Sequence, residues 1–247
     1  MKIFVAVISR NQPYWACINQ LNVATNYAYT YEEPIRIQLY PHVGDSLVCR
    51  ARNECLAIFR ESNADYLFTL DDDVVLPPDV FPLLVKANKG MIGGMYLLKT
   101  KKNNEMWLSG RTRDEVDLAE WAAKPESEQY IPMDYISTGC VLHSREFIEK
   151  MWDHYKGDPE LEYDNLDSVA GSRTKSPIRL ALYRPMVYNR EYLSEDWAFC
   201  RRAINAGFHD DLWLHAGVRC AHWGMTEYHF PSEWNAFKGI GDDNKTA

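Results

Sequence analysis

Three consecutive carboxylates, Asp71, Asp72 and Asp73, directly follow the apolar stretch YLFTL at 66–70. Two like charges about 4 Å apart repel each other by roughly 1 kcal/mol in water and by roughly 4 kcal/mol near a protein surface. A bound cation would offset this repulsion, and Mg²⁺ and Mn²⁺ prefer oxygen ligands of this kind. Capping of the next helix by a carboxylate is the simpler alternative. Three carboxylates in a row at the end of an apolar strand favour the metal site.

A second acidic group, Glu195 and Asp196, follows Ser194 at the start of a helical pattern. Either carboxylate could accept a proton as a general base. Carboxylates in a first helical turn also stabilise the helix by about 0.3–1 kcal/mol through its dipole, so the pair could serve the helix alone. His222, near the end of the pattern, could likewise bind a metal or only pack against its neighbours.

The segments that must position these residues alternate between strand and helix patterns. Apolar, β-branched runs predict strands at 2–9, 34–41, 65–70 and 91–98. Helical spacing and end signals predict helices at 13–27, 46–63 and 80–90, the last with Asp79 as N-cap and Gly90 as its end. This alternation predicts an α/β fold with a mostly parallel central sheet flanked by helices. Ligands of such sheets bind beyond the carboxyl ends of the strands, where the aspartates would lie.

The second half of the chain is less regular. Residues 99–132 form a weakly patterned polar connection, and 133–151 predict a strand, a glycine turn and a helix capped by Ser144. We expect a mobile lid at 154–176 and one strand at 178–187. The chain then predicts a helix from Ser194 to Gly207, a strand pair or bent strand at 211–224, and a disordered tail at 241–247. We expect a single domain over 1–240.

Composition narrows the class of protein. The chain has 247 residues and a formal charge of −8, which disfavours nucleic acid and anionic membrane as partners because both require a basic face. Its six cysteines form no C-x-x-C pair, so a zinc knuckle is not expected. No apolar run is long enough for a transmembrane segment or a signal peptide. We expect a reduced, cytoplasmic protein.

Five segments in this order resemble the GT-A-fold glycosyltransferases, especially those close to family 2. They are ARN at 51–53, the D-x-D-containing DDD at 71–73, TGC at 138–140, ED at 195–196 and the histidine of AHW at 221–223. The resemblance spans about 1–225. It implies a single GT-A domain in which residues 1–98 bind a nucleotide sugar, whereas residues 99–240 bind the acceptor and include the catalytic residues.

The resemblance also implies roles for individual residues. Asp71 and Asp72 would face the ribose and the metal, Asp73 would be the main ligand of Mn²⁺ or Mg²⁺, and His222 would contact the metal or a phosphate. Ser9, Arg10, Asn11, Arg52 and Asn53 would line the nucleoside pocket. The catalytic base would come from Glu195 and Asp196, with Asp196 preferred. Trp197 and Trp223 would stack on the acceptor.

The implied activity is metal-dependent transfer of a sugar from a nucleotide-diphosphate donor to a hydroxyl of a glycan or other acceptor, with inversion. The segment SRNQPY after the first strand departs from the family's usual P-T-Y/N, so UDP- and GDP-sugars both stay open as donors. Retention of configuration also stays open. A sugar-nucleotide pyrophosphorylase is a weaker alternative, since SRNQPYWAC contains no glycine. A non-catalytic sugar- or metal-binding protein on the same scaffold is the third.

Overall fold

The computed structural model describes residues 1–10, 13–102, 105–115, 117–164, 178–224 and 237–238. Three expectations therefore fall wholly or partly outside the described residues: the role of Asn11, most of the lid at 154–176 and the tail at 241–247. The helices are α1 (Trp15–Thr30), α2 (Val48–Glu61), α3 (Val80–Lys86), α4 (Leu118–Ala123), α5 (Arg145–Tyr155) and α6 (Glu195–Asn205), with short 3-10 helices η1 (Glu126–Glu128) and η2 (His209–Asp211).

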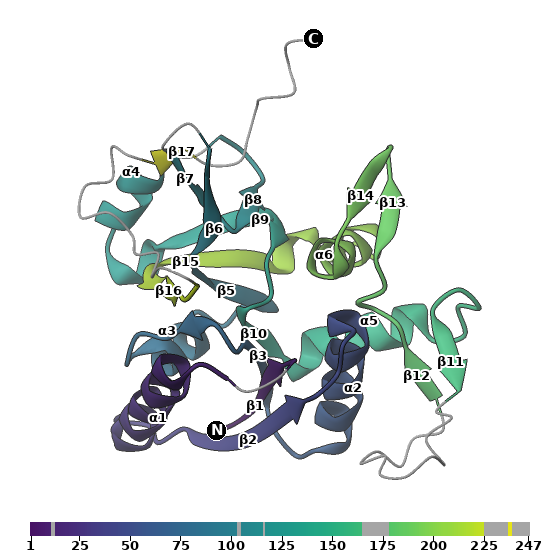
Figure 1. Ribbon diagram of the computed structural model, residues 1–247, viewed down its shortest axis with the longest axis horizontal. Coiled ribbons are helices and arrows are strands. Elements are labelled where there is room, and N and C mark those ends of the chain that lie inside the picture. Colours follow the sequence, from purple (N-terminus) through teal and green to yellow (C-terminus); the bar gives the residue numbers. More distant parts are fainter. Residues whose placement is uncertain (11–12, 103–104, 116, 165–177, 225–236, 239–247) are drawn as a thin grey trace.

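A central sheet of eight strands forms the middle layer (Figure 1). Its order is β2 (Arg36–Val43), β1 (Lys2–Ser9), β3 (Tyr66–Asp71), β10 (Cys140–Ser144), β5 (Met91–Met95), β15 (Leu212–Arg219), β9 (Tyr130–Ile136) and β8 (Gly110–Thr112). Only β10 and β9 run against the other strands. The predicted α/β class with a mostly parallel sheet is confirmed, and the two antiparallel strands are an addition to it.

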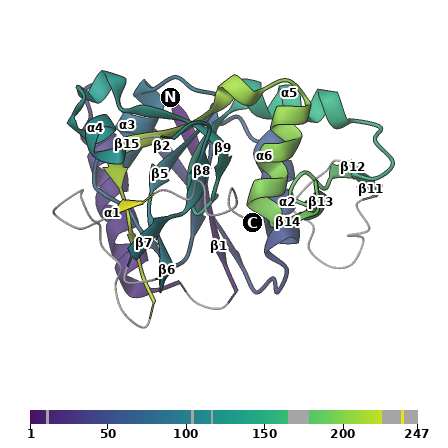
Figure 2. The same ribbon diagram turned by 90° about the horizontal axis from the view of Figure 1, so that it is seen from above.

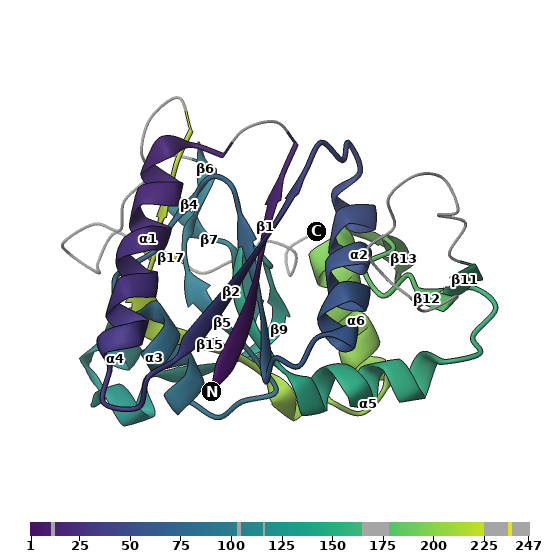
Figure 3. The same cartoon turned by 90° about the horizontal axis from the view of Figure 1, so that it is seen from below.

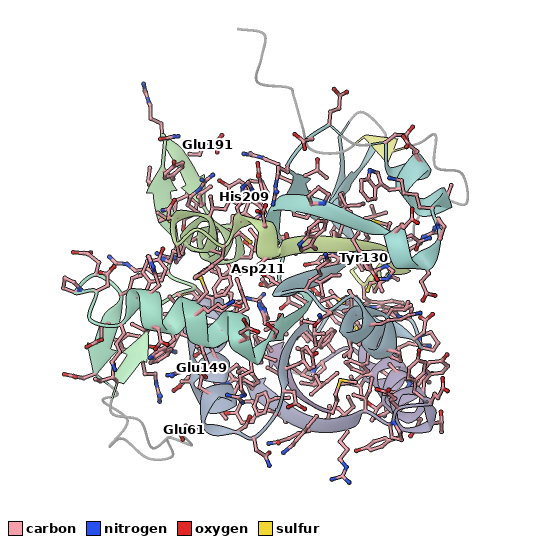
Figure 4. All side chains as sticks on the ribbon, turned by 180° about the vertical axis from the view of Figure 1, so that it is seen from behind. Glu61, Tyr130, Glu149, Glu191, His209 and Asp211 are labelled. Atoms are coloured by element: carbon pink, nitrogen blue, oxygen red, sulfur yellow. The ribbon has the colours of Figure 1, made fainter. Side chains whose placement is uncertain are left out.

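Helices cover both faces of this sheet (Figures 2 and 3). Side chains of a strand alternate between the two faces, and β1 shows this directly: Ile3, Val5 and Val7 join the core under α1 and α3. Its other apolar residues, at 4, 6 and 8, join the core under α2, α5 and α6. On that second face Glu149 of α5 accepts a hydrogen bond from Arg60 of α2 at 2.7 Å (Figure 4).

Several short strands complete the structure. They are the pair β4 (Val74–Val75) and β16 (Ala221–His222), the sheet of β6 (Leu97–Lys102), β7 (Glu105–Leu108) and β17 (Phe237–Lys238), the hairpin β11 (Glu162–Asp164) and β12 (Ile178–Leu180), and the hairpin β13 (Met186–Tyr188) and β14 (Glu191–Leu193). The β4–β16 pair lies directly after the three aspartates and places His222 opposite Val74. This pairing brings two distant segments of the chain together at the carboxyl edge of the sheet.

Some predicted boundaries differ from the structure. The single strand expected at 178–187 is two strands, β12 and β13, because residues 181–185 form a turn. The helix expected to end at Gly90 ends at Lys86, and Asn88 adopts a left-handed φ of 48° after it. The polar segment 99–132 contains regular elements that its pattern did not indicate.

Among the described residues, no helix is long and apolar enough to cross a membrane.

Other predicted signals are confirmed. Ser144 caps α5, since its hydroxyl oxygen accepts a hydrogen bond from the backbone N–H of Phe147 at 3.1 Å. Gly207 follows α6 with a φ of 86°, the left-handed conformation that glycine adopts readily at a helix C-terminus. The expected division at residue 98 stays a prediction, although strands from both sides of it share the central sheet.

Candidate active site

The three aspartates lie at the carboxyl end of β3, and each carboxylate has a different partner. Asp71 binds Arg52, with 2.8 Å between its Oδ1 and the guanidinium Nη2. Asp72 accepts a hydrogen bond from the hydroxyl of Ser9, at the end of β1. Asp73 contacts Lys99 of β6 and His222 of β16. Each carboxylate therefore has its own hydrogen-bonding or positively charged partner, and these contacts offset part of the repulsion between the three aspartates.

Arg52 links the aspartates to the acidic start of α6. Its side chain is 3% exposed, and its Nε lies 3.6 Å from Oε1 of Glu195 while Nη2 holds Asp71. Burial raises the pKa of Glu195, even though the nearby Arg52 charge favours the ionised carboxylate. Residues from α2, β3 and α6 therefore meet around one buried guanidinium, and the roles predicted for 52, 71 and 195 stay predictions.

Gly139, in the turn before β10, lets the chain pass close to Asp71. Its N–H donates to the hydroxyl of Tyr96 at 3.0 Å, and its carbonyl accepts from the N–H of Asp71 at 3.0 Å. A Cβ at this position would lie 2.7 Å from the Tyr96 hydroxyl and 2.9 Å from Oδ2 of Asp71. Contacts that short do not occur without displacement of the neighbours, so any side chain here would shift Tyr96 or Asp71.

Asp73 and His222 form a pair that is suited to a divalent cation. Oδ1 of Asp73 lies 3.4 Å from Nε2 of His222, and Nδ1 of His222 lies 2.6 Å from the carbonyl oxygen of Leu97. A carbonyl can only accept, so Nδ1 carries a proton, and in the neutral ring Nε2 then presents a lone pair toward the carboxylate. A cation between Nε2 and Oδ1 satisfies both atoms when the ring is neutral, whereas a protonated ring donates from Nε2 to the carboxylate directly. A backbone carbonyl that fixes the imidazole in this way is typical of metal-binding histidines.

The distance between these two atoms agrees with that role. Two neighbouring ligands of an octahedral ion with bonds of about 2.1 Å lie about 3 Å apart. In the part of the chain that the structure describes, no three His, Cys, Asp or Glu side chains are grouped closely enough to hold a metal. Asp73 and His222 therefore fit as two ligands of an ion that takes its remaining ligands from water or substrate. Asp71 is engaged by Arg52, and its role as a ligand stays a prediction.

Asp196 is held at the start of α6 through one of its oxygens. Oδ1 accepts hydrogen bonds from the Ser194 hydroxyl and from the Trp197 N–H, the latter at 2.8 Å. Ser194 occupies the N-cap position as expected, but its hydroxyl contacts Asp196, so no side-chain cap to the backbone forms. The backbone contact supports the helix-start interpretation of Asp196. It also fixes the carboxylate so that Oδ2 is the oxygen available to a proton donor.

The other predicted site residues occupy varied environments. Asn53 is 5% exposed, and its side-chain oxygen accepts from the N–H of Tyr183 at 2.9 Å, so it supports the 178–183 segment. Arg10 is exposed just beyond β1. One face of the Trp197 ring is covered by Tyr135, with 4.7 Å between the ring centroids. Trp223 donates its backbone N–H to the carbonyl of Asp73 at 2.7 Å. The binding roles of all four predicted residues stay predictions.

Comparisons with known proteins find a likeness in structure only. No protein-family model matches the sequence, and no curated protein matches it. Among solved structures, A197 from STIV is 16% identical with a TM-score of 0.48, over 90% of this chain and 86% of that one. GalNAc-T7, solved with UDP, GalNAc and Mn²⁺, is 9% identical with a TM-score of 0.44, over 89% of this chain and 43% of that one. S. aureus TarS 1–349 is 11% identical with a TM-score of 0.40, over 87% and 58%. A likeness this loose assigns neither a family nor an activity to the chain.

Two residues at the site were missed by the sequence analysis. Lys99 begins the polar segment 99–132, whose pattern predicts no site, yet it contacts Asp73. Tyr96, whose ring is buried 5.2 Å from that of His222, was treated only as a residue of a strand. Neither carries a local signal: Lys99 is one of several lysines near the end of a strand pattern, and tyrosine is common in strands. Tertiary packing brings them to the aspartates: Gly139 lies between Tyr96 and Asp71, and β6 places Lys99 at Asp73.

Replacement of Arg52 is expected to destabilise the protein. Arg52→Met would leave Asp71 and Glu195 without their shared cation, and a partly buried polar group that loses its partner costs about 1–3 kcal/mol. Arg50→Met is the matched control, because Arg50 is 59% exposed and pairs with Asp45 just before the same helix. We expect its loss to stay below about 1 kcal/mol. Urea unfolding of both variants measures the difference in the free energy of unfolding. Equal losses of stability would show that the contacts of Arg52 contribute no more than an exposed ion pair.

Proposed function

We propose that this chain is a metal-dependent glycosyltransferase that uses a UDP- or GDP-sugar and transfers the sugar to a hydroxyl group with inversion. The observation that carries the proposal is the Asp73–His222 pair, whose imidazole is oriented by the Leu97 carbonyl so that Nε2 faces a carboxylate oxygen. This pair lies at the carboxyl edge of an α/β sheet, and Arg52 links the neighbouring Asp71 to Glu195 at the start of α6. A divalent ion held there would neutralise charge on the leaving diphosphate.

The nucleoside of the donor would bind on the β1 side of the aspartates. Ser9 and Asp72 share a hydrogen bond there, and burial together with the neighbouring carboxylates raises the pKa of Asp72. The backbone N–H of Tyr14 also donates to the carbonyl of Asp72 at 3.2 Å, which keeps the β1–α1 connection against this residue. Ribose hydroxyls can both donate to a carboxylate and accept from a serine hydroxyl, so the pair suits a diol. Arg10 and Asn11 follow in the same connection.

The acidic residues of α6 would divide two tasks. Asp196, with Oδ1 held by Ser194 and Trp197, would remove the proton from the acceptor hydroxyl as that hydroxyl attacks the anomeric carbon. Glu195, through Arg52, would keep the start of α6 in place beside Asp71. Direct displacement by the acceptor breaks the bond to the diphosphate and inverts the anomeric carbon. Trp223, anchored to Asp73 through its backbone, would lie beside the acceptor.

Donor hydrolysis tests the proposed function without knowledge of the acceptor. Water can replace the acceptor slowly in such an enzyme, so UDP- and GDP-sugars incubated with the protein and Mn²⁺ should yield nucleoside diphosphate and free sugar. Addition of EDTA should stop the release. A pyrophosphorylase would instead need pyrophosphate and would form nucleoside triphosphate with sugar phosphate. A protein that binds these donors without release of either product would be a binding protein, and the proposal would be wrong.

A further inference from the structure

Lys99 occupies a position that the proposed function does not explain. Its ammonium contacts Oδ2 of Asp73, while His222 faces Oδ1 of the same carboxylate. Both contacts depend on β6, because this strand supplies Lys99 and also the Leu97 carbonyl that orients His222. Strand β6 therefore supplies the lysine that contacts Asp73 and also orients the histidine that faces the same carboxylate.

The ammonium provides the positive charge that this carboxylate requires in the absence of a metal. The contact between this ammonium and Oδ2 is direct, and the Asp73 side chain is only partly exposed to solvent. A divalent ion bound between Asp73 and His222 would lie close to the same ammonium, and the two positive charges would repel each other. Metal binding and the Lys99–Asp73 contact therefore oppose each other.

Lys99 has the freedom to move away from Asp73. Its side chain is 33% exposed, against 24% for Asp73, so the surrounding protein does not enclose it. Lysine carries its charge on a flexible stem with four carbons and binds phosphate as a point charge. A diphosphate that shares the metal would place negative oxygens beside this ammonium.

We propose that Lys99 neutralises Asp73 in the metal-free protein, gives up this carboxylate to the divalent ion, and then binds the phosphates of the donor. The inference rests on the proposed function for the identity of the ligand. It makes Lys99 a diphosphate-binding residue that also weakens metal binding to the protein without donor. A simple surface ion pair would do neither.

The first test measures the binding of Mn²⁺ alone. The amount of free Mn²⁺ is monitored by electron paramagnetic resonance. We expect Lys99→Met to bind Mn²⁺ at least about fivefold more tightly than the wild type, because the competing ammonium is gone. Lys150→Met is the matched control: it also removes one charge, from an exposed ion pair with Glu146 on α5 at 2.6 Å. It should leave Mn²⁺ affinity unchanged. An unchanged or weaker affinity in Lys99→Met, or no Mn²⁺ binding by either protein, overturns the proposal.

The second test measures UDP and GDP binding by calorimetry at saturating Mn²⁺. Lys99→Met should lose at least about tenfold in affinity for the preferred nucleotide, and Lys99→Arg, which keeps the charge, should recover most of it. Equal affinity in wild type and Lys99→Met overturns the phosphate contact. If the wild type binds Mn²⁺ and a nucleotide but Lys99→Met changes neither, the inference about Lys99 fails alone. If the wild type binds neither nucleotide, the proposed function fails as well.

Discussion

Asp73→Ala is expected to abolish sugar transfer and to lower Mn²⁺ affinity by at least about 100-fold. The substitution removes one of the two side chains that fit the ion, and even changes to groups that only orient metal ligands cost about 10- to 100-fold. The fold should persist, because the carbonyl of Asp73 still accepts from the N–H of Trp223 and the adjacent β4–β16 pairing does not use the carboxylate. Mn²⁺ binding and donor hydrolysis measure the loss, and far-UV circular dichroism checks the fold.

Asp65→Ala is the control for this substitution. Asp65 lies at the opposite end of the same strand, where its carboxylate accepts from the N–H of Lys2 at 2.8 Å. The substitution removes the same group and the same charge as Asp73→Ala, but residue 65 lies away from the aspartate cluster. We expect this variant to bind Mn²⁺ and to hydrolyse donor like the wild type. If Asp73→Ala keeps near-normal Mn²⁺ affinity, the assignment of Asp73 as a metal ligand is wrong.

The change in stability of Asp73→Ala should depend on pH. The pKa of Asp73 is lowered from 3.8 in the folded state, because the contacts with His222 and Lys99 outweigh the effect of burial. A lowered carboxyl pKa contributes stability above the unfolded pKa and loses it as the pH falls through the folded pKa. The variant should therefore be slightly less stable than the wild type at about pH 6, and the difference should vanish at strongly acidic pH.

Asp196→Asn is expected to reduce transfer by roughly 10²- to 10⁴-fold, the usual contribution of a general base. Asparagine keeps an oxygen that can accept from Ser194 and from the Trp197 N–H, so the local structure at the start of α6 should survive. Its amide nitrogen, in place of Oδ2, cannot accept a proton. Nucleotide affinity should change little, since the donor is held on the aspartate side of the site. Steady-state transfer rates with a hydroxyl acceptor, together with nucleotide binding, measure both effects.

Glu195→Gln separates this role from that of its neighbour. The two side chains point about 100° apart on the helix, so they should not both serve as the base. Oε1 of Glu195 lies 3.6 Å from Nε of Arg52. Its replacement should therefore weaken the contact of α6 with Arg52 more than it affects proton transfer. We therefore expect a smaller loss of rate than in Asp196→Asn. An inactive Glu195→Gln beside an active Asp196→Asn would reverse the assignment.

Local patterns were sufficient where a short stretch of chain decides its own structure. The apolar run 66–70 with its aspartates, the Ser144 cap and the Gly207 helix end were all predicted, because neighbouring residues determine each of them. The α/β class followed from the same alternation. The split of 178–187 was not predicted, since its apolar residues satisfy a strand pattern on both sides of the turn.

Long-range contacts could not be predicted in this way. The ion pair between Arg52 and Glu195 joins two residues far apart in the chain, and the contact of Lys99 with Asp73 depends on where β6 lies relative to β4 and β16. No periodicity encodes such distances. The resemblance to a known family placed 52, 71, 195 and 222 in one predicted site, whereas Lys99 and Tyr96 belong to no motif and were found from the structure.

The measurement that tests the central claim most directly is a thermal-unfolding panel of UDP- and GDP-sugars, each with Mn²⁺ and with EDTA. A ligand at about 100 times its Kd adds about 2.7 kcal/mol to the stability of the folded state, which is several degrees in Tm for a chain of this length. We expect one nucleotide class to raise Tm with Mn²⁺ and to have little effect with EDTA. The Asp73→Ala variant should show neither shift. Equal shifts with and without Mn²⁺, or no shift with any nucleotide sugar, would contradict a donor site built on Asp73 and His222.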